Sequence, residues 1–166
     1  MKNKTKKKDN KEWIYSDVVK DHFFNPRNIL LTDPKAGEFD AEGTVGNPAC
    51  GDVMKMWIKF TPTKASGIDP MKRKIKKMKW RTFGCASAIA STSMFSQMVT
   101  EKGPASTRRG KSRRGGGMKL EDALKLTPQD IMKRLGGLPP FKVHCSVLAD
   151  QAFREAVANY FKTKRS

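Results

Sequence analysis

Net positive charge is concentrated in four stretches of this chain, and that uneven distribution decides which part can form a core. The chain has 166 residues and a net charge of +18, from 34 Lys and Arg against 16 Asp and Glu. Residues 1–11, 64–81, 102–119 and 162–166 together carry +22, so the rest of the chain carries −4. Only 37% of the residues are hydrophobic, which places part of the chain outside the core. One folded domain is therefore predicted over 13–162.

Three segments lack the side chains that a core requires. Residues 1–12 are rich in lysine and are predicted to be a disordered basic tail. Residues 103–117, with the sequence GPASTRRGKSRRGGG, form a basic, low-complexity insert within the domain. Residues 163–166 are expected to be a short C-terminal tail.

The composition excludes several classes of protein. No run of about 18 apolar residues is present, so neither a membrane span nor a membrane partner is expected. The N-terminal lysines are not followed by an apolar segment, unlike a secretory signal, and Asp9 without any arginine is unlike an organelle transit peptide. Three cysteines without a CxxC pair fit neither a disulfide framework nor a zinc ribbon. The expected compartment is the cytoplasm, where thiols stay reduced.

The apolar pattern predicts an α+β fold, a small antiparallel sheet of about three strands with helices packed on one face. A short helix capped by Ser16 is expected over 17–24, and a loop over 25–42. Strands are expected over 53–60, which is apolar on both sides, and over 73–83. The lysines of the second strand indicate a solvated face or an edge protected against pairing.

The rest of the chain is predicted to be helical. A helix over 86–101 begins with small side chains that permit close packing against the sheet. A short helix is expected over 118–126, and Thr127 begins another with a capping residue followed by proline. The last helix is expected over 145–161, with a broad apolar stripe.

The three cysteines all lie at boundaries between predicted elements. Cys50 is in a turn before a strand, Cys85 lies between a strand and a helix, and Cys145 begins the last helix. A helix N-terminus favours the thiolate, which is the form that binds metal or attacks a sulfur donor. Asp52 and His144 add a carboxylate and an imidazole beside two of these thiols.

These five side chains predict a shared metal or sulfur site. A free cysteine is often only a small buried hydrophobe, but all three here lie at turns. Soft thiolates select zinc or iron–sulfur centres, and a four-coordinate site needs only four of the five groups, which indicates ligand exchange. The oxygen of Asp52 is a harder ligand than a thiolate, so its bond to cluster iron is expected to be the easier one to replace. His22 has no cysteine nearby in sequence and is expected to be structural.

Four motifs, in this order along the chain, resemble the U-type iron–sulfur cluster assembly scaffolds (IscU and the N-terminal domain of NifU). They are Tyr15-Ser16-Asp17-Val18-Val19 with Asn25-Pro26-Arg27-Asn28, Val45-Gly46-Asn47-Pro48-Ala49-Cys50-Gly51-Asp52-Val53-Met54-Lys55, Thr82-Phe83-Gly84-Cys85-Ala86-Ser87-Ala88-Ile89-Ala90-Ser91, and Leu138-Pro139-Pro140-Phe141-Lys142-Val143-His144-Cys145-Ser146. The resemblance covers about residues 13 to 162, apart from the basic inserts.

The resemblance implies a carrier protein and not an enzyme. A cysteine desulfurase delivers persulfide sulfur, iron is added, and a transient [2Fe–2S] cluster is built and passed to acceptor apoproteins. The implied ligands are Cys50, Cys85 and Cys145, with Asp52 or His144 completing the site. Cys145 is also the implied persulfide acceptor.

The resemblance also implies a docking segment for an Hsp70-type chaperone and its J-protein. This segment is Leu138-Pro139-Pro140-Phe141-Lys142, in which Phe141 stands where the family usually has valine. An extended, exposed form is expected, because that form suits capture in a chaperone groove.

Two other functions are considered. The first is a zinc-binding sulfur-transfer partner of a desulfurase, similar to SufU, whose branch has an insertion in the same region. That branch usually lacks the histidine before the last cysteine and the Leu-Pro-Pro-x-Lys segment, and both are present here, which favours the scaffold branch. Zinc in an isolated sample would not distinguish the two, because thiolate–imidazole sites also take up zinc opportunistically.

The second is nucleic-acid binding through the basic segments, whose contacts to phosphates would be nonspecific and dependent on salt. No aromatic residue is interleaved between Arg108 and Arg114, so base stacking is not expected. The basic segments are also able to steer acidic protein partners, among them an acidic iron donor or regulator. For residues 1–11, a solvated tail that only aids solubility explains the charge at least as well.

Overall fold

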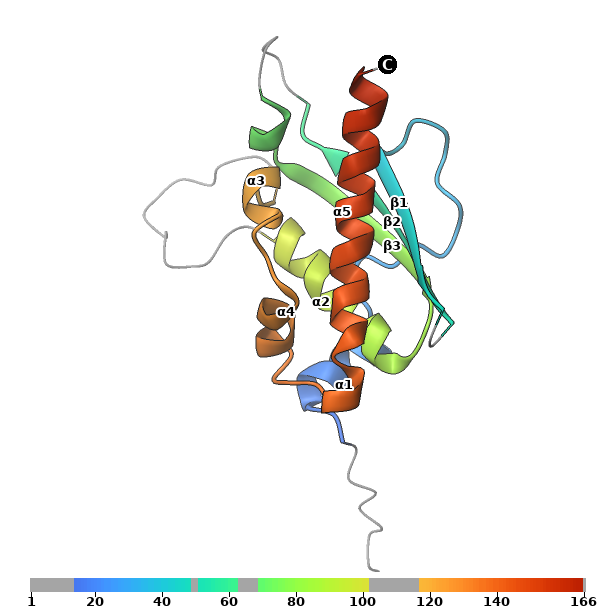
Figure 1. Ribbon diagram of the computed structural model, residues 1–166, viewed down its shortest axis with the longest axis vertical. Coiled ribbons are helices and arrows are strands. Elements are labelled where there is room, and N and C mark those ends of the chain that lie inside the picture. The colour runs from blue at the N-terminus through green and yellow to red at the C-terminus, as the bar shows by residue number, and fades with distance from the viewer. Residues whose placement is uncertain (1–13, 49–50, 63–68, 102–116, 166) are drawn as a thin grey trace, which may run out of the picture.

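A three-stranded antiparallel sheet is the centre of the fold, and helices cover one of its faces (Figure 1). The computed structural model describes residues 14–48, 51–62, 69–101 and 117–165. The strands are β1 (Ala41–Asn47), β2 (Asp52–Phe60) and β3 (Ile75–Phe83), in the spatial order β1-β2-β3. This arrangement confirms the predicted α+β class, and β2 and β3 lie where strands were predicted.

Strand β1 begins where the pattern predicts the end of a loop over 25–42. Its sequence, AEGTVGN, holds two glycines and no apolar run, so nothing in it is typical of a strand. It is a strand because it pairs with β2 from Ala41 opposite Ile58 onward. Gly43 lets α5 (His144–Arg165) pack directly on the strand, since a Cβ there would lie 2.8 Å from the carbonyl oxygen of Ala152.

Five α-helices and two short 3-10 helices surround the sheet within the described residues. The remaining α-helices are α1 (Asp17–Phe24), α2 (Ala86–Thr100), α3 (Leu120–Ala123) and α4 (Pro128–Arg134); the 3-10 helices are η1 (Pro70–Lys72) and η3 (Pro140–Lys142). The predicted starts are confirmed for α1, α2 and α4, and the side chains of Thr127 and Asp130 form a capping box at α4. α3 is shorter than the predicted 118–126.

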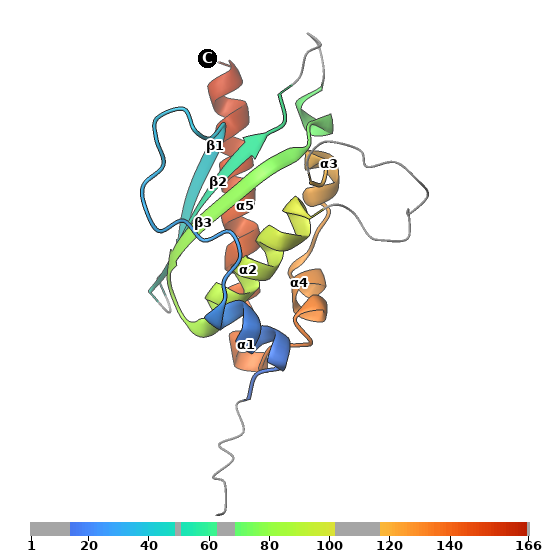
Figure 2. The ribbon, with the colours of Figure 1, turned by 180° about the vertical axis from the view of Figure 1, so that it is seen from behind.

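The core lies between the sheet and the pair of helices α2 and α5. β2 turns a row of fully buried side chains toward these helices: Met54, Met56, Ile58 and Phe60. Phe95 of α2 and Phe153 of α5 close the core from the other side, with ring centroids 5.2 Å apart in an edge-to-face arrangement. Figure 2, seen from behind, shows the sheet in front of α5.

The opposite face of the sheet is largely solvated, as the lysines of β3 predict. Trp57 is the exception at 2% exposed, because Phe39 packs near it and Lys55 and Arg81 lie over its ring. The outer edge of β3 is partly protected, since the backbone of residues 28–30 hydrogen-bonds to Trp80.

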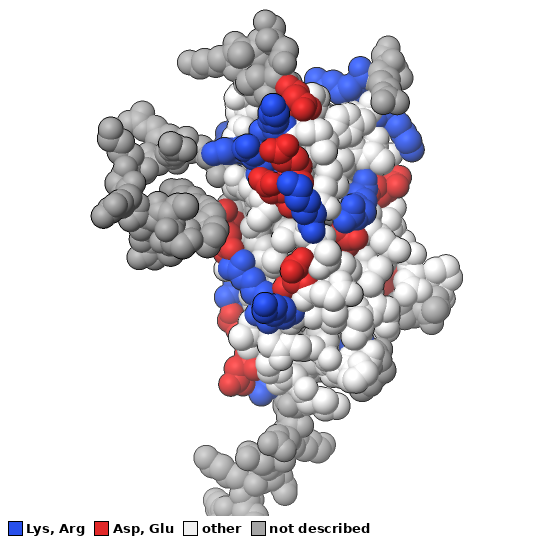
Figure 3. All heavy atoms as spheres, turned by 60° about the vertical axis from the view of Figure 1, so that its left-hand side comes forward, with Lys and Arg blue, Asp and Glu red and all other residues white. Residues whose placement is uncertain are grey.

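The charges of the described residues are mixed. Figure 3 shows basic and acidic side chains interleaved over the upper part of one face. Several of them form ion pairs, including Arg154 with Asp150 and Lys125 with Asp122. The predicted tail over 1–12 and nearly all of the insert over 103–117 lie outside the described residues.

Helix α5 continues to Arg165, beyond its predicted end at 161, so the predicted C-terminal tail over 163–166 is wrong for residues 163–165. The last turn is stabilised by contacts four residues apart. Thr163 Oγ1 donates to the carbonyl of Asn159 at 3.0 Å, and Lys164 Nζ lies 5.7 Å from the ring centroid of Tyr160. Neither α5 nor any other described helix is both long and apolar enough to cross a membrane.

Candidate metal centre

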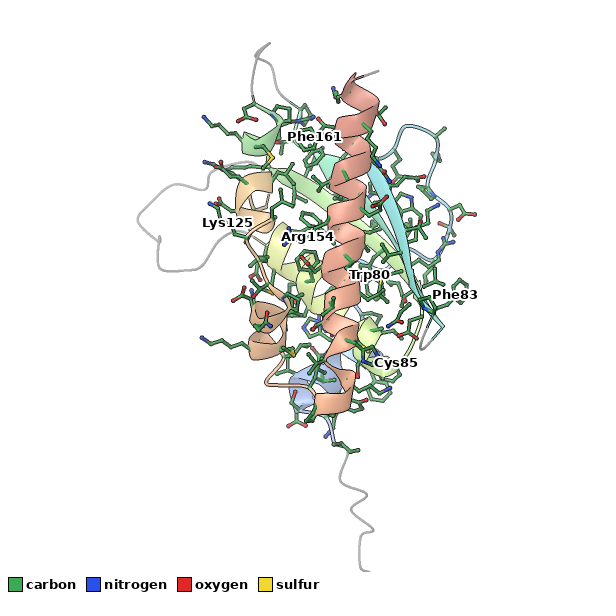
Figure 4. All side chains as sticks on the ribbon, viewed as in Figure 1. Trp80, Phe83, Cys85, Lys125, Arg154 and Phe161 are labelled. Carbon is green, nitrogen blue, oxygen red and sulfur yellow. The ribbon has the colours of Figure 1, made fainter. Side chains whose placement is uncertain are left out.

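Asp52, Cys85 and Cys145 converge at one end of the molecule. One ligand atom from each lies within 4.8 Å of the other two, and the two Sγ atoms are 3.4 Å apart. Figure 4 labels Cys85 near the lower end of the molecule, where β3 leads into α2. Two sulfurs on one tetrahedral metal lie about 3.8 Å apart, given a metal–sulfur bond of about 2.3 Å. The thiols are therefore already close to the spacing that a shared metal ion needs.

The fold brings these three residues together from the starts of three elements. Asp52 opens β2, Cys85 is the N-cap of α2, and Cys145 lies in the first turn of α5. Antiparallel pairing of Val53 with Phe83 sets the start of β2 beside the end of β3, and so Asp52 beside Cys85. The predicted position of both thiols at helix N-termini is confirmed.

The two thiols lie within hydrogen-bonding distance, and their pKa values shift in opposite directions. A hydrogen bond from the Cys145 thiol lowers the pKa of Cys85 to about 5; burial opposes this shift, while the backbone N–H of Ala88 and the charge of Lys142 favour it. The same hydrogen bond raises the pKa of Cys145, and burial raises it further. The pair is thus a thiolate at Cys85 and a thiol at Cys145, which is itself 0% exposed.

The carboxylate of Asp52 is buried without full compensation. Asp52 is 6% exposed, and its Oδ2 atom has no hydrogen-bond partner among the described residues. A buried polar atom without a partner costs free energy. A cation bound between this oxygen and the two sulfurs would satisfy it, so the donor set fits a thiophilic metal with one oxygen ligand.

The other two predicted ligands are Cys50 and His144. Cys50 lies outside the described residues, two positions before Asp52. His144 is exposed and is not a member of the converging group. It lines a surface hollow of about 320 Å³ together with Asn47 and Pro48, which precede Cys50 in the chain. A role for His144 as the alternate ligand stays a prediction. His22 is buried, with Nδ1 2.7 Å from Ser93 Oγ, which fits the structural role predicted for it.

The sequence of this chain matches a known family model over nearly its whole length. The model is described as the NifU-like N terminal domain, and it covers residues 14–109 and 114–166. The chain belongs to this family. The predicted resemblance is therefore confirmed.

Several relatives in the NifU-like family are named as iron–sulfur cluster assembly proteins. The iron-sulfur cluster assembly scaffold protein IscU 1 of Archaeoglobus fulgidus is 41% identical over 149 residues, covering 90% of this chain and 78% of that protein. The iron sulfur cluster assembly protein 2, mitochondrial, of Saccharomyces cerevisiae is 39% identical, covering 92% of this chain and 81% of that protein.

Solved structures share the fold of this NifU-like domain. A putative scaffold protein for the SUF system from Fervidobacterium islandicum has a TM-score of 0.54 at 17% identity, covering 86% of this chain and 96% of that one. The N-terminal part of a NifU-like protein from Brucella abortus has a TM-score of 0.53 at 14% identity, covering 89% and 94%. At these identities the likeness concerns the fold alone.

The segment 138–142, which resembles the chaperone-docking motif of the family, is not fully extended or exposed as predicted. Leu138 is half-buried against the core and Pro139 is buried. Residues from Pro140 on form the 3-10 helix η3, in which the N–H of Lys142 donates to the carbonyl of Pro139 at 2.8 Å. The positive charge of Lys142 also acts to lower the pKa of both thiols. Its place in the docking motif does not indicate this role.

Proposed function

We propose that this protein is a scaffold on which a [2Fe–2S] cluster is assembled from iron and from sulfur delivered by a cysteine desulfurase, and from which the cluster passes to acceptor apoproteins. The observation that carries the proposal is the convergence of Asp52, Cys85 and Cys145 within 4.8 Å. Membership of a family whose relatives are named scaffold proteins supports it. The cluster is cargo, so the protein acts as a carrier and not as an enzyme.

The proposed ligands differ in how firmly they hold the cluster. Cys50, Cys85 and Cys145 supply thiolates, which bind iron in clusters strongly. Asp52 supplies the fourth ligand, and its harder oxygen gives the bond that breaks first on transfer. The exposed ring of His144 would replace Asp52 by a movement at the start of α5.

Cys145 is the proposed acceptor of the sulfur. Its thiolate attacks the outer sulfur of the persulfide on the desulfurase; a new sulfur–sulfur bond forms on Cys145, and the donor leaves as a thiolate. The proton of the Cys145 thiol passes to the departing thiolate of the desulfurase, because Cys85, with a pKa of about 5, is too weak a base to take it. Because Cys145 is buried, delivery requires a movement that exposes its sulfur.

Other partners are proposed from the chain's own features. An Hsp70-type chaperone with its J-protein would dock on residues 138–142, after Leu138 and Pro139 leave their contacts. An acidic iron donor or regulator would be steered by the basic segments. A cytoplasmic location is predicted from the three cysteines without a disulfide framework, and it is tested by cell fractionation.

The test is anaerobic assembly with iron, cysteine and a desulfurase. The full-length protein should develop the visible charge-transfer absorption of a [2Fe–2S] cluster, and Cys50→Ser, Cys85→Ser and Cys145→Ser should each lose it. Asp122→Ala, at an exposed carboxylate of α3, is the matched control and should assemble normally. Normal assembly by both Cys50→Ser and Cys145→Ser would contradict the ligand assignment.

A zinc-bound sulfur-transfer partner of a desulfurase is the second candidate. The specific observation in its favour is the donor set, since two thiolates and a carboxylate also fit tetrahedral zinc. Metal analysis after anaerobic assembly separates the two functions. Stoichiometric iron and sulfide support the scaffold, whereas retained zinc with full stimulation of the desulfurase supports the alternative.

A further inference from the structure

Gly84 lies directly against the carboxylate of Asp52, and we propose that the missing side chain at this position sets where that ligand oxygen sits. An added Cβ on Gly84 would lie 3.1 Å from Cγ of Asp52. It would also lie 3.1 Å from Oγ1 of Thr82 and 3.2 Å from Cβ of Ala88. The inference rests on the proposed function, because it concerns how one ligand of the metal centre is held.

Backbone conformation does not explain this glycine. The described glycines with positive φ are Gly37, Gly51, Gly136 and Gly137, and Gly84 is not among them. Alanine can therefore adopt the backbone conformation of Gly84 without strain. The glycine is needed for space alone.

Of the three groups around this space, the side chain of Asp52 is the one that can rotate away without breaking a hydrogen bond that fixes it to the described residues. Thr82 is fixed because its Oγ1 donates to the carbonyl of Val53 at 2.7 Å. Ala88 is fully buried in the first turns of α2 and has no side-chain torsion that could relieve the contact. Oδ2 of Asp52 has no hydrogen-bond partner among the described residues. A methyl group at position 84 would therefore displace the carboxylate first.

A small displacement of this carboxylate is enough to weaken its bond to a metal. Contacts of 3.1 Å must open by a few tenths of an ångström, and ligand distances in metal sites hold to within about 0.2 Å. Gly84 is thus a positioning residue that acts through Asp52. It governs the ligand whose bond is expected to break first when the cluster leaves.

The experiment is a double-mutant cycle with Co²⁺ as the probe, on reduced, metal-free, full-length protein. Affinity and the cobalt absorption bands are measured for wild type, Gly84→Ala, Asp52→Ala and the double variant. Gly84→Ala should bind Co²⁺ about tenfold more weakly than wild type, and it should add no further loss in the Asp52→Ala background. Gly46→Ala is the matched control and should bind as wild type, because its Cβ would have only ordinary contacts of 3.7 and 3.9 Å.

A rescue variant guards against misfolding of Gly84→Ala. Ala88→Gly combined with Gly84→Ala gives the new methyl group room on the α2 side, and should recover most of the Co²⁺ affinity. Wild-type affinity of Gly84→Ala would overturn the inference. So would an equal loss in the Asp52→Ala background, which would mean that Gly84 acts through the backbone of Cys85. Failure of the proposed function looks different, because it appears as loss of the cluster absorption in the anaerobic assembly test and leaves the Co²⁺ cycle unchanged.

Discussion

The Sγ atoms of Cys85 and Cys145 lie 3.4 Å apart, and the contact shifts the pKa values of the two thiols in opposite directions. Cys85 is partly exposed and ionises with a pKa of about 5. Cys145 is buried, and its pKa is raised. The residue that is more reactive without metal is thus not the one proposed to accept sulfur.

Alkylation of the metal-free protein should follow this difference. Iodoacetamide should modify Cys85 with a rate that rises through a midpoint near pH 5, because the thiolate is the reacting form. Modification of Cys145 should be slow throughout, and peptide mass spectrometry distinguishes the two sites. In Cys145→Ala the midpoint for Cys85 should move to higher pH, since the hydrogen bond that lowers its pKa is lost. An unchanged profile in this variant would show that Cys145 does not control Cys85.

Asp52→Ala should make the metal-free protein more stable while weakening metal binding. The substitution removes a buried oxygen without a partner, so the free energy of unfolding should rise by about 1 kcal/mol. Urea denaturation in the presence of a chelator measures the change. Asp40→Ala is the matched control and should be destabilising, because Asp40 accepts hydrogen bonds from Lys59 Nζ and the N–H of Phe60. A loss of stability in Asp52→Ala would indicate that the carboxylate has compensating contacts.

Acidification should weaken the fold through His22. Burial, aided by the charge of Arg27, lowers the pKa of His22 below its usual 6.5. The unfolded chain then takes up a proton before the folded one does. Stability is therefore complete above pH 6.5 and falls as the pH drops from 6.5 toward the lower pKa of the folded state. Thermal melts across this window should depend less on pH in His22→Gln than in wild type, and equal slopes would argue against the assignment.

Gly43→Ala should destabilise the fold without touching the metal centre. The new methyl group would meet the backbone of α5, and overpacking of this kind costs about 1–3 kcal/mol. Thr44→Ala, at the exposed neighbouring position of β1, should change the urea midpoint little. If Gly43→Ala is as stable as Thr44→Ala, α5 can move away from the strand more easily than its packing indicates.

The fold class could be predicted from sequence, and so could the placement of three of the five proposed ligands. Cysteines at turns before helices mark Cys85 and Cys145 directly, and Asp52 follows from its place beside Cys50 in a turn before a strand. β1 could not be found in this way, because its two glycines, of which Gly43 serves close packing of α5, resemble a loop signal. The end of α5 and the turn at η3 are stabilised by local hydrogen bonds, from Thr163 to Asn159 and from Lys142 to Pro139, which the apolar periodicity of the sequence does not report.

The two thiols that meet at the metal centre are separated by 60 positions in the chain, and the later one belongs to the final helix. During synthesis, a ribosome-bound chain that has released β1 to β3 and α2 still lacks this partner. The centre therefore cannot close until the last helix has emerged and docked on β1. A chain truncated before α5 lacks Cys145 and is therefore left without a complete binding centre.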